Sequence, residues 1–510
     1  MADEKKLNKE QLEAIKHQKG PLLIIAGAGT GKTTVITERI KHLILSGAAK
    51  PSEVLALTFT EKAAREMETR VDVAMPYGFT QMWIMTFHSF CDRILRLEAL
   101  NIGYNPRYKL LKQAESIQLV RKNLFDFKLD YFRPLGNPNK FIEAMLNHFS
   151  RLQDEDITPY EYAKWASSQN SKAKTSDEKI EVKKYSELAS AYKTYDELKV
   201  KEGYMDFGDL IVKTLKLFKE RKNILADYQK LFKYILVDEF QDTNFAQNEL
   251  ALLLAGRNKN VAVCGDDDQS IYRFRGAAVS NILQFKRHFP RTKIVTLSKN
   301  YRSSQEILDR TYKLINFNNP DRLEVIAKVD KKLISQVKYP ESEIKFFHTD
   351  RVENEADTVA RKISSLVSEL KYKYSDFAIL VRANNHAEPF GRALSRHGIP
   401  YQFLGPGRLF RQPEVVDLIS YLKVLYNIDD SVSLYRLISL TAFDIPPIDI
   451  SRVGNYARKN NISLFEACEV ISDLPVSVHT QKIITQIISQ IKSHLGLIEK
   501  SQPGNYFIIF

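Results

Sequence analysis

Short apolar runs alternate with amphipathic segments over the first 300 residues. The runs are four to six residues long and rich in Val, Ile, Leu or Tyr, which suits strands that are buried on both faces. They lie at residues 21–26, 54–59, 83–87, 234–237, 261–264 and 294–297. Most are followed by stretches with helical periodicity, such as 32–46 and 61–71. This alternation predicts an α/β fold, with a parallel sheet covered by helices on both faces.

A long span in the middle of this pattern departs from the alternation. Between Phe90 and Tyr234 lie about 140 residues, whereas a crossover between parallel strands needs only about a dozen. The span is rich in Lys and Glu and mostly helical in pattern, with breaks at 133–136 and 167–176. We therefore expect an inserted helical subdomain.

The C-terminal part of the chain shows two further changes of pattern. A second sheet-like region is expected from about Ile344, and FAILVR at 377–382 is its clearest predicted strand. The stretch 400–413 is rich in Gly and Pro, and helical periodicity resumes after it and continues to the end. The pattern contains no internal repeat and no low-complexity segment.

Length and composition limit the kinds of protein that this chain can be. A length of 510 residues suggests roughly three or four domains. The net charge of +13 favours a polyanionic partner such as nucleic acid, although solubility alone also accounts for a basic surface. Cys91, Cys264 and Cys468 lie far apart, which argues against a disulfide framework, a zinc site or an iron–sulfur cluster. The charged N-terminus and the absence of an apolar run near ~18 residues predict a soluble, cytoplasmic protein without membrane contact.

A glycine-rich loop follows the first apolar run, in the sequence PLLIIAGAGTGKT at 21–33. Backbone N–H groups of such a loop close around phosphate oxygens, Lys32 would reach the β- and γ-phosphates, and the Thr33 hydroxyl would hold Mg²⁺. A dinucleotide fingerprint does not fit, because Lys32 occupies the sixth place of GxGxxG. An ordinary βα turn is the alternative, but the Lys-Thr pair favours an ATP site. The predicted binding residues are Ala26, where the strict pattern has Gly, and Gly27, Ala28, Gly29, Thr30, Gly31, Lys32 and Thr33.

Two adjacent carboxylates end another apolar run, in YILVDEFQDTN at 234–244. Open α/β sheets bind their ligands at the carboxyl ends of the strands. At that edge, Asp238 would order Mg²⁺ and Glu239 would polarise the attacking water. Taken alone, the pair also suits a helix N-cap with charge in the first turn. With a phosphate loop upstream, catalysis is the better interpretation.

These two motifs together resemble the UvrD/Rep/PcrA family of superfamily-one DNA helicases. Further motifs agree in order and spacing: LNKEQ (7–11), TFTEKAA (58–64), TFHSFC (86–91), GDDDQSIYRFRGA (265–277) and NYRSS (300–304). Weaker matches are DFGDL (206–210) and the stretches 377–401 and 408–425. The resemblance extends over nearly the whole chain.

The resemblance implies a P-loop NTPase fold with RecA-like parallel-sheet lobes and inserted helical subdomains. On that pattern we expect five parts: 1–88 and 204–303 for the first lobe, 89–203 for its insertion, 304–404 for the second lobe, and 405–510 for an incomplete second insertion. It also implies an ATP-dependent DNA helicase that uses Mg²⁺ and moves 3′ to 5′ on single-stranded DNA. Its partners would be single-stranded and duplex DNA, in repair or replication.

The same resemblance implies roles for residues around the nucleotide. Gln11 would read the adenine edge, and Tyr301 would stack on the adenine ring. Gln269 would sense the γ-phosphate and couple it to DNA, and Arg302 would neutralise charge on the transferring phosphoryl group. The catalytic set is then Lys32, Asp238, Glu239, Gln269 and Arg302. Thr34 stands where many relatives have an Arg beside the adenine, which puts that contact in doubt.

Five residues are implied as DNA contacts. Phe59, Tyr272 and Phe274 resemble stacking platforms, since binding without sequence preference needs aromatic faces. Phe59 also suits the core, because it ends a buried strand. His88 is either a DNA contact or a helix-start histidine, and Arg275 is either a coupling residue or a surface charge.

Two family motifs, KGLE and TRA, do not occur after Asn300. We therefore expect an incomplete second lobe, either because the chain is a fragment of a longer protein or because it is a shortened relative. Such a chain should bind Mg-ATP and single-stranded DNA, hydrolyse ATP poorly and fail to unwind duplex. The alternatives are the helicase subunit of a helicase–nuclease and a DNA-binding, ATP-responsive module without unwinding.

Overall fold

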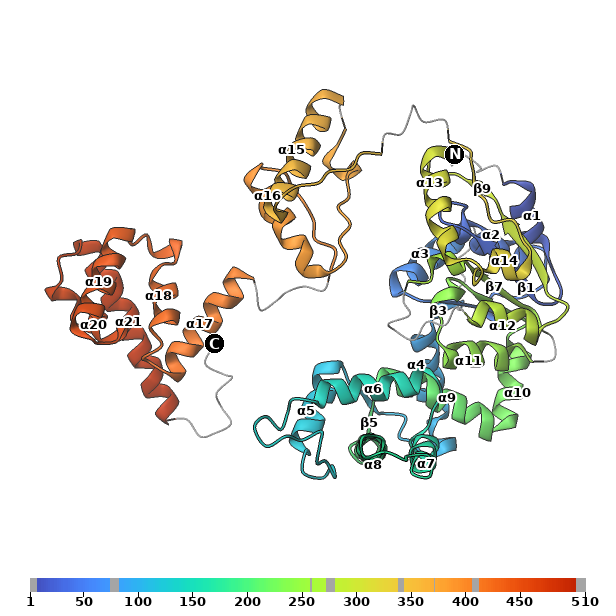
Figure 1. The fold of residues 1–510 in the computed structure, drawn as a ribbon, viewed down its shortest axis with the longest axis horizontal. Helices are drawn as coiled ribbons and strands as arrows, with labels where there is room; N and C mark the ends of the chain where they lie inside the picture. The colour runs from blue at the N-terminus through green and yellow to red at the C-terminus, as the bar shows by residue number, and fades with distance from the viewer. Residues whose placement is uncertain are drawn as a thin grey trace. The chain divides into compact units, whose positions relative to one another are not determined.

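The computed structural model describes residues 7–73, 82–256, 259–271, 280–337, 344–370, 372–405 and 412–500. The chain divides into two compact units, 1–345 and 346–510, both shown in Figure 1. Within the described residues, no helix combines the length and the apolar character needed to cross a bilayer. The five-part division expected from the sequence stays a prediction.

The first unit is built on a six-stranded parallel sheet with the strand order β3-β2-β6-β7-β1-β8. Its strands are β1 (Leu22–Ala26), β2 (Val54–Thr58), β3 (Trp83–Thr86), β6 (Tyr234–Val237), β7 (Val261–Gly265) and β8 (Lys293–Leu297). In the register, Ile24 of β1 lies between Cys264 of β7 and Val295 of β8. The sequence predicted all six strands, and the predicted α/β class is confirmed.

Helices cover both faces of this sheet, because alternate strand residues point to opposite sides. Leu22 and Ile24 pack in one apolar core, and Leu23 and Ile25 pack in the other. The helices of the first face are α1 (Lys9–Lys16), α2 (Lys32–Leu45) and α3 (Glu61–Asp72). Those of the second are α4 (Phe87–Glu98), α9 (Phe207–Glu220), α10 (Lys222–Leu231), α11 (Phe245–Ala255) and α12 (Ser280–His288).

A helical insertion lies between β3 and β6, as predicted, and forms the blue-green group of helices in Figure 1. It contains α5 (Gln113–Lys122), α6 (Ile142–Asp154), α7 (Pro159–Gln169) and α8 (Ser176–Lys201), with the short pair β4 (Lys109–Leu110) and β5 (Tyr204–Met205). Its core is separate from that of the sheet and includes Phe127, Phe149 and Tyr195. Asn244 donates a 2.6 Å hydrogen bond to Asp154 at the end of α6, so the insertion contacts the DEFQDTN segment.

The chain continues from β8 into a small layer that lies against the phosphate loop. Its elements are β9 (Lys299–Asn300), α13 (Gln305–Ile315), α14 (Leu323–Ala327) and β10 (Ile334–Ser335), and β10 pairs with β9 in parallel. Asn300 and Tyr301 bond to the loop itself: the Asn300 Nδ2 donates to Ala28 O at 2.6 Å, and the Tyr301 N–H donates to Gly29 O at 2.9 Å.

The second unit begins with α15 (Val352–Leu370) and α16 (Ala387–Arg396), which pack around Ala356, Ala360 and Leu394. The strand predicted at 377–382 is wrong. Phe377 and Ile379 do pack against this small core, but the structure describes no strand between 344 and 405 in the residues it covers. An apolar run can bury one side of an extended segment, whereas a strand also needs a neighbour to complete its backbone hydrogen bonds.

In the described range 412–500, five helices confirm the helical periodicity predicted after residue 413. They are α17 (Pro413–Tyr426), α18 (Ser431–Ile438), α19 (Pro447–Asn460), α20 (Leu464–Glu469) and α21 (Val478–Lys500). They share one core, which includes Leu434, Val453, Phe465 and Ile484.

Candidate nucleotide-binding and hydrolysis site

The phosphate loop connects the carboxyl end of β1 to the first residue of α2, Lys32. Gly29 and Gly31 have φ values of +76° and +87°, which side chains rarely adopt. A Cβ at Gly29 would also lie 2.7 Å from the Cβ of Arg302. Thr30 closes the loop through its hydroxyl, which donates to Gly27 O at 2.8 Å. Ala26 is fully buried in the core as the last residue of β1, so its side chain does not face the loop.

Lys32 lies at the centre of the predicted catalytic residues. Its Nζ donates to Glu239 Oε2 at 2.8 Å and to Gln269 Oε1 at 3.1 Å. Burial lowers the pKa of Lys32, but the Glu239 carboxylate outweighs this effect and holds the pKa above its ordinary value. The three residues come from the loop after β1 and the segments after β6 and β7. Because β7 lies between β6 and β1, these segments meet at one edge of the sheet.

Asp238 is a buried carboxylate at the end of β6. Burial, and then the Glu239 carboxylate, raise the pKa of Asp238 to about 6. The backbone N–H of Glu239 donates to Asp238 Oδ1 at 2.9 Å, and among the described residues this is the one hydrogen bond to that carboxylate. Glu239 itself has a φ of +49°, an unusual value for a residue with a side chain. Such strain is typical of functional sites.

The surroundings of Asp238 fit a divalent cation. Within the described part of the chain Asp238 forms no ion pair, although the nearby Lys32 charge acts to lower its pKa. Such a buried carboxylate suits Mg²⁺, which prefers one or two carboxylates together with phosphate oxygens. Thr33, beside Lys32 at the start of α2, offers a hydroxyl at the same edge of the sheet. Asp238 and Thr33 are therefore the residues that would hold Mg²⁺, and this assignment stays a prediction.

Replacing Asp238 by asparagine should stabilise the unliganded chain and abolish Mg²⁺-dependent hydrolysis. Since the pKa is raised from 3.8 to about 6, the folded state binds this proton more tightly than the unfolded state does. The free energy of unfolding therefore falls as pH rises from about 4 to about 6, and it stays lowered at neutral pH. Asparagine removes this cost, so denaturant unfolding at pH 7 without Mg²⁺ should show a gain of about 1–3 kcal/mol. An unchanged or lower stability would contradict the assigned cost of burial.

Gln11 and Tyr301, the residues predicted to contact the adenine, both form hydrogen bonds with Asn8. The Asn8 N–H donates to Gln11 Oε1 at 3.0 Å, and Gln11 Nε2 donates to Thr30 O at 3.0 Å. Asn8 Nδ2 donates to the Tyr301 hydroxyl, also at 3.0 Å. Tyr301 is 45% exposed as a residue, which is compatible with stacking on its ring. Asn8 was not predicted as a site residue, although its N-cap position in LNKEQ is a signal for it.

Asn300 fixes the turn that carries Arg302. Its Oδ1 accepts from the N–H groups of Arg302 and Ser303 at 2.9 and 2.8 Å, while its Nδ2 bonds to the phosphate loop. The Arg302 side chain is exposed, and within the described ranges its guanidinium has no hydrogen bond or ion pair. An arginine held beside the loop by its backbone is available to a phosphate group. Arg302 was predicted from the sequence as a site residue, whereas Asn300 was not.

Gln269 follows three consecutive aspartates at the end of β7. The carboxylates of Asp266, Asp267 and Asp268 are close enough to share a cation. The Lys331 ammonium already lies among them, at 2.5–2.7 Å from each. We therefore assign no metal to this cluster. Lys331 was not predicted, because nothing in the local sequence relates it to these aspartates.

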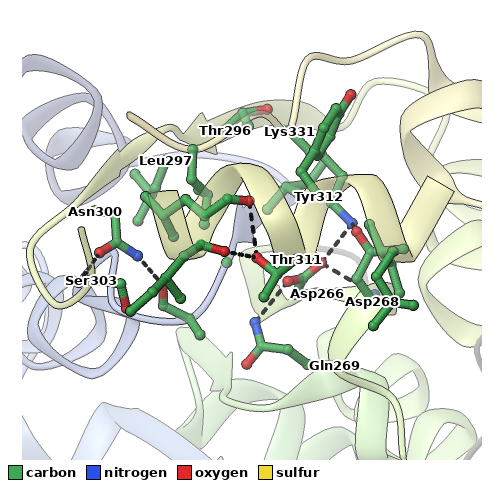
Figure 2. Close-up of a pocket in the computed structure, with 18 of the residues that line it drawn as sticks. Asp266, Asp268, Gln269, Thr296, Leu297, Asn300, Ser303, Thr311, Tyr312 and Lys331 are labelled. Atoms are coloured by element: carbon green, nitrogen blue, oxygen red, sulfur yellow. Dashed lines mark hydrogen bonds and ion pairs between the residues drawn. The ribbon is translucent and has the colours of Figure 1, made fainter. Parts of the chain in front are cut away.

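A cavity of about 350 Å³ lies between the phosphate loop, α13 and the aspartates (Figure 2). Ile307, Leu308 and Ile315 contribute apolar surface, and Gln269 and Lys331 lie at its polar side. The cavity thus lies between α13 and Gln269, whose side chain is bonded to Lys32 and Asp266.

The predicted DNA contacts are only partly described. Tyr272, Phe274 and Arg275 lie outside the described residues. Phe59 is half-buried directly after β2, and His88 lies in the first turn of α4, directly after β3. Both therefore lie at the same edge of the sheet as the phosphate loop. The His88 ring packs edge-on against Phe207 at 5.8 Å, and burial lowers its pKa against the opposing effect of Glu61. DNA binding by all five residues stays a prediction.

Two family models match the chain. The UvrD/REP helicase N-terminal domain matches residues 7–290, and the UvrD-like helicase C-terminal domain matches residues 295–490. Together they cover the sheet, its insertion and most of the second unit. They confirm the resemblance inferred from the motifs and the P-loop NTPase fold that it implied.

Full-length relatives agree with this assignment. The chain is 35% identical over 473 residues to an ATP-dependent DNA helicase PcrA of Bacillus subtilis, a match that covers 92% of this chain and 60% of the relative. It is 34% identical to the PcrA of Staphylococcus epidermidis (98% and 64%) and 36% identical to that of Staphylococcus aureus (90% and 59%). The chain thus spans less than two thirds of the length of these relatives. It belongs to the UvrD/REP helicase family.

Proposed function

We propose that this chain is the ATP-hydrolysing and DNA-translocating core of an ATP-dependent DNA helicase. The observation that carries the proposal is the hydrogen-bonded set of Lys32, Glu239 and Gln269 beside the phosphate loop. Relatives with 34–36% identity are named ATP-dependent DNA helicases, which supports the same reaction. From the family resemblance of the motifs we also propose 3′ to 5′ movement on single-stranded DNA, in repair or replication.

ATP hydrolysis would begin when Lys32 exchanges its contact with Glu239 for contacts with the phosphates of ATP. In the structure, the Glu239 carboxylate lies 2.8 Å from the Lys32 ammonium and neutralises it. When ATP fills the loop, its β- and γ-phosphates compete for Lys32, and Glu239 becomes free to accept a proton from the attacking water. Mg²⁺, held by Thr33 and Asp238, would supply charge that stabilises the phosphates. Arg302 would meet the charge that develops on the γ-phosphoryl group.

Coupling to DNA would pass through the segment after β7. Gln269 contacts Lys32, and the sequence places the predicted stacking residues Tyr272 and Phe274 within five positions of it. Because the predicted contacts Phe59 and His88 follow β2 and β3, a strand of DNA would lie along the carboxyl edge of the sheet. A change in the contact between Gln269 and the γ-phosphate would then be transmitted to the bases of bound DNA through residues 269–274.

The test uses purified residues 1–510. ATP turnover is expected to be slow but should rise on addition of single-stranded DNA, and any duplex unwinding should favour a 3′ tail over a 5′ tail. ATP and DNA binding without DNA-stimulated turnover would contradict the proposal and would indicate an ATP-responsive DNA-binding module.

Phe274→Ala should weaken binding of single-stranded DNA by about 1–3 kcal/mol, the usual range for one lost base–aromatic stack. ATP affinity without DNA should remain unchanged, because the residue is assigned to the DNA strand. Fluorescence anisotropy with a labelled oligonucleotide measures the effect. Intact DNA affinity together with a large fall in melting temperature would assign Phe274 to the core instead.

A further inference from the structure

A buried lysine far along the chain is bonded to the segment that carries Gln269. Lys331 precedes β10, and its side chain is 5% exposed. Its Nζ lies 2.6 Å from Asp266 Oδ1, 2.5 Å from Asp267 Oδ1 and 2.7 Å from Asp268 Oδ2. Figure 2 shows Lys331 pointing toward Asp266 and Asp268 at the polar side of the cavity. Removing one partner of such a buried set leaves the remaining charges uncompensated.

Asp266 connects this lysine to Gln269. One carboxylate oxygen of Asp266 is bound by Lys331, and the other accepts from Gln269 Nε2 at 2.7 Å. With its nitrogen held there, the amide of Gln269 presents Oε1 to Lys32 at 3.1 Å. The reversed amide would direct an N–H group at the ammonium and an oxygen at the carboxylate, so both bonds would be lost. The orientation of Gln269 therefore depends on the position of the Asp266 carboxylate.

A second buried cation in the cluster does not touch Asp266. Arg322 donates Nε and Nη2 to the two oxygens of Asp268 at 2.8 and 2.7 Å. Its Nη1 contacts Glu324 at 2.8 Å and Asn316 at 2.6 Å. Arg322 thus holds Asp268 in place, and it also holds Asn316 and Glu324 of its own segment. Among the described residues, Lys331 is the basic side chain that contacts Asp266.

We propose that Lys331 is a positioning residue for ATP hydrolysis, which holds Asp266 and thereby orients the Gln269 amide toward Lys32 and the γ-phosphate. This inference rests on the proposed function. It predicts that the layer formed by α13, α14 and β10 contributes to the chemistry through a fixed hydrogen-bond chain, without any contact of Lys331 with the nucleotide.

The first experiment compares Lys331→Met with Arg322→Met. Single-turnover hydrolysis is measured with excess protein, saturating single-stranded DNA and labelled ATP, at a temperature where both variants are folded by circular dichroism. Lys331→Met should lower the rate by about 10–100-fold, since misplacing one positioned group costs roughly 10²-fold. Its Kd for ATP should change less than about 3-fold, and Lys331→Arg should restore part of the rate.

Arg322→Met should lower the melting temperature with a much smaller effect on the rate. Equal effects of the two variants on the rate would overturn the proposal.

A double-mutant cycle tests whether Lys331 acts through Gln269. In a Gln269→Ala background, Lys331→Met should produce little further loss of rate, because the group that it positions is already absent. Losses that multiply would overturn the proposal. If Lys331→Met does not fold, Asp266→Asn tests the next residue in the series of hydrogen bonds. The hydrolysis rate of this variant should fall, while its affinity for ATP should be unchanged. An unaltered rate in that variant would also count against the inference.

The wild-type measurement separates this inference from the proposed function. If the wild-type chain binds ATP and DNA but shows no single-turnover hydrolysis, the proposed function is wrong and the inference falls with it. If the wild-type chain hydrolyses ATP and Lys331→Met does so at the same rate, only the inference is wrong.

Discussion

Replacing Lys32 by alanine is expected to lower DNA-stimulated ATP hydrolysis by at least about 10²-fold, the usual effect of removing one group that stabilises transition-state charge. The Lys32 side chain is 9% exposed, and its ammonium is the charge that the structure places between Glu239 and Gln269. Without it, the β- and γ-phosphates lose a cation, and ATP affinity should fall as well. Steady-state turnover and ATP titration measure the two effects.

Lys41→Ala is the matched control for this variant. Lys41 lies on the same helix, α2, and pairs with Glu38 at 2.9 Å, so its removal also deletes an ion-paired lysine. It lies away from the loop and should leave turnover unchanged. Near-normal turnover in Lys32→Ala would mean that the phosphate-loop assignment is wrong. An equal loss in both variants would indicate a structural effect on α2.

The sheet and the loop could be predicted because their signals are local. The apolar runs of the six strands and the phosphate loop are each read from fewer than fifteen consecutive residues. The carboxyl ends of parallel strands lie at one edge, so the meeting of Lys32, Glu239 and Gln269 also follows once the strands are known. The family motifs added the assignment of Gln269 to this set.

The partners that hold these residues could not be predicted, because their contacts are distant in sequence. Lys331 lies 63 and 64 positions from Asp268 and Asp267, and in sequence it is one lysine among many. Whether a lysine is buried among carboxylates depends on tertiary packing. The same reason accounts for the wrong strand at 377–382, where Phe377 and Ile379 gave the apolar pattern but pairing depended on residues elsewhere.

Replacing Arg302 by alanine should reduce hydrolysis by about 10³-fold or more, while ATP binding and folding are preserved. An arginine that meets charge on the transferring phosphoryl group contributes 10³–10⁵ to the rate. The backbone N–H of residue 302 would still donate to Asn300 Oδ1, so the turn beside the phosphate loop should stay intact. Because the side chain is exposed, its removal should not lower the melting temperature.

Arg310→Ala provides the comparison for Arg302. Arg310 lies on α13, its side chain is 68% exposed, and it contacts Glu306 at 4.0 Å, so the variant removes an arginine from the same layer away from the loop. Turnover in Arg310→Ala should match that of the wild type. If Arg302→Ala binds ATP normally and hydrolyses it at the wild-type rate, the γ-phosphoryl charge is met by another group. If ATP affinity falls as much as the rate, Arg302 binds the ground state and does not act selectively on the transition state.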